Sequence, residues 1–295
     1  MYLISYIILY PIIMLVSRLP FWVIYRISDI LYFISYYLIG YRKKVVFSNL
    51  HLAFPEKSEK EIKQIAKNSY KHFVDILAES IKAFSISKKE LDKRYLFKNT
   101  ELFQKLANKN KSIALVGSHY ANWEWGIHLK IHTPHHVFGS YTKLSNPYFN
   151  NLICQSRGKF GFQLVPTSET IPLIKNNEVN DVLSLYVLLS DQSPMLQKTV
   201  YWNEFLGVKV PIHVGAETLS KKYDLAVVYF SVDKIKRGFY EVTFKLLAED
   251  SSNYKNYEIT DHFLKLVEEQ IKSKPAFYFW THNRFKHKDK MPVLK

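Results

Sequence analysis

The feature that most constrains the fold of this chain is a series of short apolar runs separated by segments of helical length. The runs lie beyond residue 99 and occupy residues 113–117, 136–141, 162–166, 182–190, 225–232 and 239–247. The segments of helix length between or after them cover residues 121–131, 147–159, 168–176, 213–222 and 257–273. Strands that alternate with helices predict a mainly parallel sheet covered on both faces. We therefore expect an α/β fold with a mainly parallel central sheet flanked by helices, in a single domain over residues 46–295.

A long amphipathic helix is predicted ahead of these runs, over residues 58–85. Ser58 followed by Glu61 matches the capping box that begins many helices. Apolar side chains then recur from Ile62 to Phe84 at spacings of about three and four residues, which places them on one face of a helix. This helix would pack its apolar face against the rest of the domain.

The N-terminal segment is nearly free of charge, and residues 1–17 carry no charged side chain. Such a run is the short end of what spans a bilayer core of about 30 Å. A signal peptide is not expected, because no basic residue precedes the run and no small-x-small motif follows it. A membrane anchor is favoured over a buried core helix, and the basic residues Arg42, Lys43 and Lys44 favour a cytoplasmic position for the remainder. We expect residues 1–45 to form a membrane anchor, transmembrane or interfacial, and an interfacial helical segment.

The net charge of the chain limits the kinds of partner that it is expected to bind. The net charge of +15 favours an anionic partner, which could be a membrane surface, a nucleic acid or an acidic protein. No nucleic-acid-binding motif is apparent, so no nucleic-acid partner is expected. Cys154 is the only cysteine, which excludes an intrachain disulfide and a zinc site built on thiolates. With no metal-ligand cluster apparent in the sequence, we expect no metal and no cofactor.

His119 and Glu124 are the candidate catalytic pair. The predicted strand ends at Gly117 and a helix is expected to begin near Ala121, so His119 lies at the carboxyl end of a strand, where open α/β sheets bind ligands. Glu124 falls in the first helical turn, where side chains lean back toward the helix start and the helix dipole favours the ionised carboxylate. This predicts a general base, His119, oriented by Glu124, with a substrate hydroxyl as the nucleophile.

A second histidine and acid share this spacing. His51 and Glu56 are separated by the same interval, and chance alone predicts about one such pair in a chain of this composition. Phe54 and Pro55 lie between them in a loop, with no strand before the pair. The context therefore favours His119 over His51.

Several motifs follow one another along nearly the whole chain. The most distinctive is Gly-Ser-His-Tyr-Ala-Asn-Trp-Glu at residues 117–124. The others are Gly40-Tyr41-Arg42-Lys43-Lys44, Asn146-Pro147, Arg157-Gly158, Ser190-Asp191-Gln192, Phe205-Leu206-Gly207 and Trp280-Thr281-His282-Asn283-Arg284-Phe285-Lys286. In content and order they resemble the motifs of the bacterial lipid A biosynthesis acyltransferases, the lauroyl and myristoyl transferases of the lysophospholipid acyltransferase superfamily.

The resemblance implies an O-acyltransferase in which His119 and Glu124 deprotonate an acceptor hydroxyl. The hydroxyl attacks the thioester of an acyl carrier protein, with acyl-coenzyme A as the other donor to consider. The acceptor would be a lipid A precursor or a related membrane lipid, at the cytoplasmic face of the bacterial inner membrane. Asn283, where a cation would be common, and the sequence after Gln192 depart from the family pattern and leave the acceptor open.

The remaining residues of these motifs are candidates for substrate binding. Arg157 would hold a phosphate or the phosphopantetheine arm, since a guanidinium suits bidentate phosphate binding, or it is a surface arginine. Asp191 and Gln192 follow an apolar strand and would border the same cleft, or cap the structure. Arg284 and Lys286 would be cations at the cleft rim, or part of an exposed basic tail. The full set is Asn122, Tyr141, Arg157, Asp191, Gln192, Arg284 and Lys286.

Other functions remain open at this point. A glycerophospholipid acyltransferase would use the same chemistry on a smaller acceptor. A non-enzymatic basic protein that binds membranes would depend on its cations and not on His119. A hydrolase would use the histidine and acid to activate water, although no Gly-x-Ser-x-Gly elbow is apparent.

Overall fold

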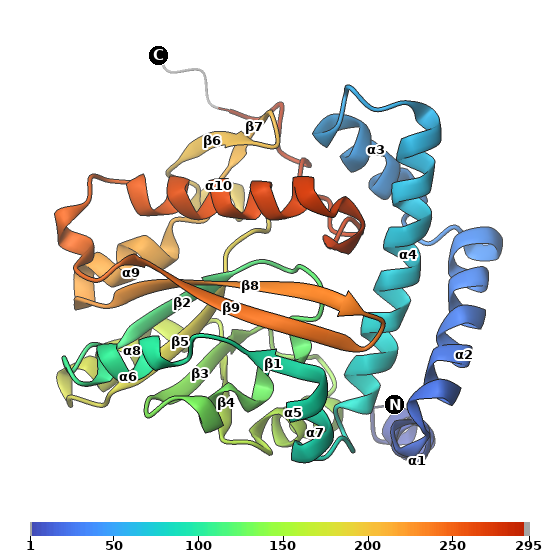
Figure 1. Cartoon of the computed structure of the whole chain (residues 1–295), viewed down its shortest axis with the longest axis horizontal. Helices are drawn as coiled ribbons and strands as arrows, with labels where there is room; N and C mark the ends of the chain where they lie inside the picture. Colours follow the sequence, from blue (N-terminus) through green and yellow to red (C-terminus); the bar gives the residue numbers. More distant parts are fainter. Residues whose placement is uncertain (1, 292–295) are drawn as a thin grey trace.

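A computed structural model of the chain describes residues 2–291. Its centre is a seven-stranded sheet with the order β1-β9-β8-β2-β5-β3-β4 (Figure 1). Strands β8 and β9 pair antiparallel, and the other neighbours pair parallel. The strands are β1 (Tyr95–Phe97), β2 (Ile113–Gly117), β3 (His136–Tyr141), β4 (Phe162–Pro166), β5 (Ser184–Leu189), β8 (Ala226–Lys236) and β9 (Phe239–Ala248). The predicted mainly parallel sheet is confirmed.

Strand β2 lies between β5 and β8, and each of its five residues is buried. A strand covered on both faces reads as a continuous apolar run, which is why its sequence lacks alternation. Strands β2 and β5 are parallel and in a register that places Gly117 beside Leu189. Their carboxyl ends therefore meet at one edge of the sheet, and the residues that follow them, including His119 and Asp191, become neighbours.

Helices flank the sheet as predicted. In Figure 1, α10 lies along one side of the β8–β9 pair, and α5 and α6 lie on the other. A small antiparallel hairpin, β6 (Trp202–Phe205) and β7 (Val208–Pro211), adds a second sheet. The flanking helices are α5 (Lys88–Arg94), α6 (Glu101–Ala107), α7 (Pro147–Gly158), α8 (Thr170–Val179), α9 (Gly215–Tyr223) and α10 (Glu258–Ser273), with short 3-10 turns at η3 (Leu196–Lys198), η4 (Ser251–Asn253) and η5 (Pro275–Phe277).

The predicted long helix is α4, Glu59–Lys82. Its capping box is present, because Ser58 Oγ accepts from the Glu61 amide at 3.4 Å while the Ser58 amide donates to Glu61 Oε2 at 2.9 Å. Helix α4 stands across the end of the β8–β9 hairpin (Figure 1). There Arg237 pairs with Asp75 of the helix at 2.6 Å, so a polar contact as well as apolar packing fixes α4 to the sheet.

The N-terminal segment forms α1 (Tyr2–Arg18), α2 (Phe21–Phe33), the π-helix η1 (Ile34–Ile39) and α3 (Lys43–Ala53). Helix α3 crosses the predicted boundary between residues 45 and 46. The side chain of Asn49 donates to the carbonyls of Trp280 and His282 at 2.9 and 2.7 Å, and Arg42 donates to the carbonyl of Thr281 at 2.9 Å. Residues 42–49 therefore hold the C-terminal loop in place, and the division into anchor and domain stays a prediction.

Many large apolar side chains of the N-terminal helices are exposed, among them Ile4, Ile8, Leu15, Trp22, Leu38 and Ile39. Within the described residues, however, the structure contains no individual helix with both the length and the hydropathy to cross a membrane. One helix pair, Phe21–Ile39 with Lys43–Ala53, satisfies both criteria jointly and bends by 91°. The expected membrane anchor in residues 1–45 therefore stays a prediction.

The segment after β2 differs from the expectation. A helix was expected over residues 121–131, but the chain forms the 3-10 helix η2 over Glu124–His132. Ala121 has a left-handed φ of 50°, and its amide donates to the carbonyl of Phe277 at 2.9 Å. These backbone constraints delay the start of the helix and leave residues 118–123 as a loop. We call this segment the His119 loop.

Candidate active site

The C-terminal segment of the chain holds the His119 loop in place. The Phe279 amide donates to the carbonyl of His119 at 3.1 Å, and Tyr120 forms an isolated antiparallel bridge with Tyr278. Gly117, at the end of β2, lies against the ring of Phe230, which a Cβ at this position would approach to 2.2 Å. Glycine, which has no Cβ, allows this close approach. The glycine at the start of the motif is therefore needed for the packing of β2 against Phe230.

His119 is paired with Asp191. Its Nδ1 lies 2.7 Å from Oδ1 of Asp191, and the two side chains are 18% and 1% exposed. An ionised carboxylate can only accept, so the proton of a neutral imidazole lies on Nδ1 and Nε2 carries the lone pair. The pair therefore fixes the tautomer that a general base needs.

His119 and Asp191 each shift the pKa of the other toward the charged form. Burial lowers the pKa of His119, but the charge and hydrogen bond of Asp191 raise it by more, so the pKa lies above its ordinary value. For Asp191 the two effects have the opposite signs. Burial raises the pKa of Asp191, but the interaction with His119 outweighs burial and holds the pKa below its usual range. Asp191 is therefore ionised and stabilises the imidazolium that proton transfer would create.

The structure does not confirm the expectation that Glu124 orients His119, which stays a prediction. Glu124 forms an ion pair with Arg157 at the end of α7 and accepts from Trp123 Nε1 at 3.2 Å. Among the described residues no hydrogen bond joins Glu124 to His119. The reason is that η2 begins at Glu124 and not near Ala121. Glu124 therefore follows the His119 loop directly and does not lie within an earlier helical turn, from which its side chain would lean back toward His119. Its charge still contributes to raising the pKa of His119, after burial and Asp191.

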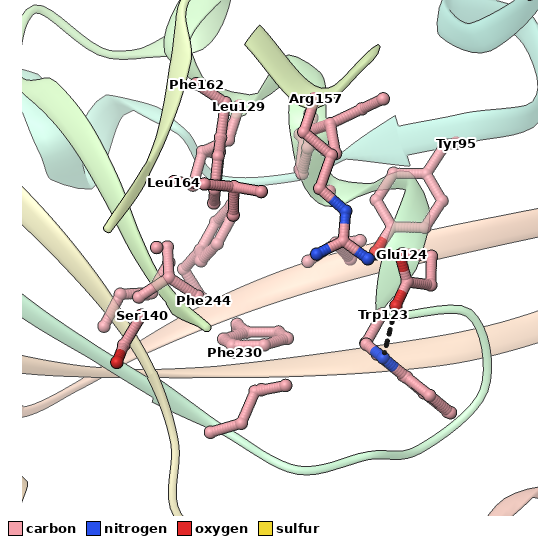
Figure 2. A pocket seen from close by; sticks show the side chains of 18 residues that line it. Tyr95, Trp123, Glu124, Leu129, Ser140, Arg157, Phe162, Leu164, Phe230 and Phe244 are labelled. Carbon is pink, nitrogen blue, oxygen red and sulfur yellow. Dashed lines mark hydrogen bonds and ion pairs between the residues drawn. The ribbon is translucent and has the colours of Figure 1, made fainter. Parts of the chain in front are cut away.

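A cavity opens beside this ion pair, with an empty volume of about 680 Å³ that includes space open to solvent. In Figure 2 the polar groups of Trp123, Glu124 and Arg157 lie together on one side. The rest of the lining is mostly apolar and includes Leu115, Leu129, Phe162, Leu164, Val187, Phe230, Val242 and Phe244. The lining therefore suits an apolar group with a polar end beside the ion pair.

His119 is connected to this cavity through Trp123. The rings of His119 and Trp123 meet edge to face, with their centroids 5.2 Å apart, and Trp123 also lines the cavity. The ring of Phe279 lies against both. Trp123 therefore separates the imidazole from the cavity.

Two of the residues predicted to bind substrate have other contacts. Asn122 is completely buried, and its amide donates to Glu79 at 2.6 Å while accepting from the Trp125 amide at 3.0 Å. Both polar atoms of Asn122 are thus used inside the protein, so a substrate contact by this residue is not supported. Tyr141, at the end of β3, donates to Asn150 Oδ1 at 3.2 Å and does not belong to the cavity lining described above.

The C-terminal candidates divide into two kinds. Arg284 is 1% exposed, and its Nη1 donates to the carbonyl of Pro211 at 3.3 Å, so it is neither a rim cation nor part of an exposed tail. Lys286 is exposed. Gln192 follows Asp191 and is half-buried beside the site. The placement brings together Asp191 and His119, and separately Arg157 and Glu124.

Sequence reasoning missed three residues around the pair. Tyr278 is buried, and burial together with the charge of Asp191 raises its pKa. His282 Nε2 accepts from the Ser193 amide at 3.3 Å, which fixes the loop after Asp191. Glu79, on α4, accepts from the Asn122 amide. His282 lies in the C-terminal motif and could have been chosen from it, whereas Glu79 lies in an amphipathic helix with no motif of its own.

The rival pair does not form. His51 Nε2 lies 3.1 Å from Oε1 of Glu59, not from Glu56, and the Glu59 side chain is 85% exposed. Glu56 instead lies 3.9 Å from Lys57. An exposed pair of this kind lacks the cavity and the buried carboxylate that surround His119, so the choice of His119 is supported by its setting.

A buried histidine–carboxylate pair at the carboxyl edge of a parallel sheet, next to an apolar cavity, is compatible with an enzyme that activates a hydroxyl or a water molecule. A family model described as bacterial lipid A biosynthesis acyltransferase matches residues 1–287. The chain belongs to this family, as the order of its motifs predicted, and is an acyltransferase. It is similar to the lipid A biosynthesis lauroyltransferase of Escherichia coli (strain K12), with 24% identity over 273 residues that cover 92% of this chain and 88% of the relative.

Proposed function

We propose that this protein transfers a fatty acyl group from an acyl-carrier-protein thioester to a hydroxyl of a lipid A precursor or a related membrane lipid, with His119 as general base. The observation that carries the proposal is the His119–Asp191 pair at 2.7 Å beside an apolar cavity. Family membership and the similarity to a lauroyltransferase support the acyl group and the lipid acceptor.

In the proposed reaction, His119 Nε2 takes the proton of the acceptor hydroxyl as its oxygen attacks the thioester carbonyl carbon. The tetrahedral intermediate collapses with cleavage of the carbon–sulfur bond, and the imidazolium returns the proton to the thiolate that leaves. Asp191 takes the orienting role that the sequence assigned to Glu124, because its carboxylate bonds Nδ1. The products are the lipid ester and the free carrier thiol.

We place the acyl chain in the cavity. Each buried methylene contributes about 0.8 kcal/mol to binding, which gives a long chain a strong preference for the lining of Phe230, Leu164 and Phe244. Arg157 at the polar end keeps its proposed role of holding an anionic group. One side of its guanidinium is paired with Glu124, and its other N–H groups remain to donate to a phosphate.

The exposed apolar surface of α1, α2 and η1 supports the proposed position at the cytoplasmic face of the inner membrane. Ile4 and Leu15 of α1 are 63% and 66% exposed, and burial of such side chains in lipid is favourable. We expect that replacing Ile4, Ile8 and Leu15 with Ser moves the protein from the membrane to the soluble fraction. Replacing Val179, Val200 and Ile235, which are similarly exposed elsewhere, is the matched control. Equal loss of membrane binding in both triple variants would contradict the proposed surface.

The reaction itself is tested by mass spectrometry of lipid products from the full chain in detergent micelles. Acyl-carrier-protein and coenzyme A thioesters are compared as donors, and a lipid A precursor and a lysophospholipid as acceptors. Acylation of the lipid A precursor is expected, with the carrier-protein donor preferred. Acylation of the lysophospholipid alone would favour the glycerophospholipid alternative, and thioester hydrolysis without ester formation would favour the hydrolase.

The role of Glu124 can be separated from that of Asp191. If Glu124 acts through Arg157, then Glu124→Ala and Arg157→Ala should raise the KM for the same substrate, and the double variant should be little worse than either single one. If Glu124 instead orients His119, as the sequence suggested, Glu124→Ala should lower kcat while Arg157→Ala leaves kcat nearly unchanged. The kcat values of the two single variants decide between these roles, because the charge of Glu124 affects the pKa of His119 in either case.

A further inference from the structure

A second group of imidazole and carboxylate side chains lies at the far end of η2 from Glu124. It consists of Asp92 on α5 and of His128 and His132 on η2, which are four residues apart. One ligand atom of each residue lies within 4.8 Å of the others. His128 is completely buried, while Asp92 and His132 are half-buried. This group is separate from the His119–Asp191 pair.

Two buried atoms of this group lack a partner. The Nδ1–H of His128 donates to the carbonyl of Trp125 at 3.0 Å, which leaves the lone pair on Nε2. Within residues 2–291, neither His128 Nε2 nor Asp92 Oδ1 has a hydrogen-bond partner, although both atoms are buried. They lie 3.8 Å apart, which is too long for a hydrogen bond. Two buried acceptors that face each other require a cation or a proton donor between them.

The residues around His128, His132 and Asp92 orient these side chains as metal ligands are oriented. A backbone carbonyl that accepts from one imidazole nitrogen is the usual support for a histidine that binds metal through the other. The ring of Phe97 lies against both imidazoles, with centroids 4.7 Å from His128 and 5.0 Å from His132, and limits their rotation. Lys88 occupies the outer oxygen of Asp92, Oδ2, at 2.6 Å, so the inner oxygen is the one that faces the histidines.

We propose that Asp92, His128 and His132 bind a divalent transition-metal ion, with zinc as the best fit. Two imidazole nitrogens and one carboxylate oxygen are ordinary zinc ligands at about 2.0–2.2 Å, which places the ligand atoms of a tetrahedral ion roughly 3.3 Å apart. The 3.8 Å between His128 Nε2 and Asp92 Oδ1 needs only a small side-chain movement to reach this value. The fourth position is left to water.

The ion would connect α5 to η2 and so act as a structural link under the cavity. Glu124 is the first residue of η2, and the cavity is lined by Gly126, Ile127 and Leu129 of the same element. No metal is expected from the sequence because no metal-ligand cluster is apparent in it, and Asp92 is remote in the chain from the two histidines. This inference does not rest on the proposed function, since metal binding can be measured without acyl transfer.

The experiment uses the full chain in detergent, with any histidine tag removed, stripped with a chelator and titrated with Zn²⁺. We expect about one zinc per chain by elemental analysis, together with a rise in thermal midpoint that a chelator reverses. Co²⁺ as a second probe should give visible absorption bands with nitrogen and oxygen ligation and no thiolate charge-transfer band.

His132→Ala and Asp92→Asn should each weaken zinc binding at least tenfold and abolish the thermal shift. They are chosen because both side chains are half-buried, so folding is less at risk than with His128. The matched control is His51→Ala, which removes an imidazole beside the single carboxylate of Glu59 and should leave binding unchanged. Absence of bound zinc in the parent chain, or equal binding by all three variants, would overturn the proposal.

Discussion

Two buried carboxylates contact the His119 loop and differ in protonation. Asp191 is 1% exposed and bonds His119, and its pKa lies below the usual range because this interaction outweighs burial. Glu79 is 0% exposed and bonds Asn122, Tyr25 and Tyr240. Burial and the nearby Asp75 raise the pKa of Glu79 to about 7, against smaller opposing effects of Lys234 and the tyrosines.

The comparison shows that burial alone does not decide ionisation. A buried carboxylate remains charged when an imidazole directly bonded to it can carry the opposite charge. Glu79 is bonded by neutral donors, and its protonated form is therefore favoured as the pH falls toward 7. We infer that Asp191 serves proton transfer, whereas Glu79 joins α4, β9 and the His119 loop.

The largest expected effect comes from breaking the ionised pair. His119→Ala should reduce acyl transfer by at least ~10²-fold, the low end of the contribution of a general base, with folding and membrane association unchanged. His51→Ala, at the other matching pair in the sequence, should retain near-normal transfer. A damaging His51→Ala with an active His119→Ala would show that the wrong histidine was chosen.

Asp191→Asn should lower transfer by about 10²-fold and move its pH dependence. In the parent enzyme, kcat/KM falls as the pH falls through the pKa of His119, because a protonated imidazole cannot accept a proton. Asp191 raises that pKa, so its removal lowers the pKa and shifts the acid limb to lower pH. A limb that stays in place would mean that another group controls the profile.

Glu79→Gln should have little effect on transfer but should change the dependence of stability on pH. The folded-state pKa of Glu79 is raised from 4.5 to about 7, so the folded state binds a proton that the unfolded state has lost. This stabilisation is complete below 4.5 and is lost as the pH rises through 7, at up to about 1.4 kcal/mol per pH unit. The variant should lack that slope in the free energy of unfolding, measured with denaturant. An unchanged slope would assign it to another group.

The smallest effect is expected from cations outside both buried sites. Lys286, Lys288 and Lys290 are exposed, so their interactions are screened by salt. Neutralising all three should raise the KM for acyl carrier protein more than it lowers kcat, because such charges steer the encounter. Neutralising the exposed Lys60, Lys63 and Lys105 changes net charge equally and is the control. No salt dependence for any of these proteins would refute docking through charge.

Many of the strands and helices could be predicted from the sequence because they depend on the pattern of neighbouring residues. Apolar runs at residues 113–117, 136–141 and 162–166 became strands with those same bounds, since short, mainly apolar runs bounded by turn residues favour strands. The capping box at Ser58 was readable for the same reason: it involves residues three apart. The antiparallel pairing of β8 with β9 and the hairpin of β6 with β7 were not predicted. Each pair is joined by a two-residue turn, Arg237-Gly238 or Leu206-Gly207, and neither turn has the Asn-Gly or Asp-Gly sequence that most strongly indicates a hairpin.

The candidate active site likewise has features that the sequence determined and features that only the tertiary structure decided. The sequence by itself determined that His119 follows a buried strand within a family-specific motif, and that Asp191 follows another strand. Only the tertiary structure decided that β2 and β5 are neighbours in register, which brings Asp191 to 2.7 Å from the imidazole and gives Glu124 to Arg157. The physical reason is that an electrostatic partner is chosen by distance through space, and spacing along the chain fixes that distance only inside a regular helix or strand.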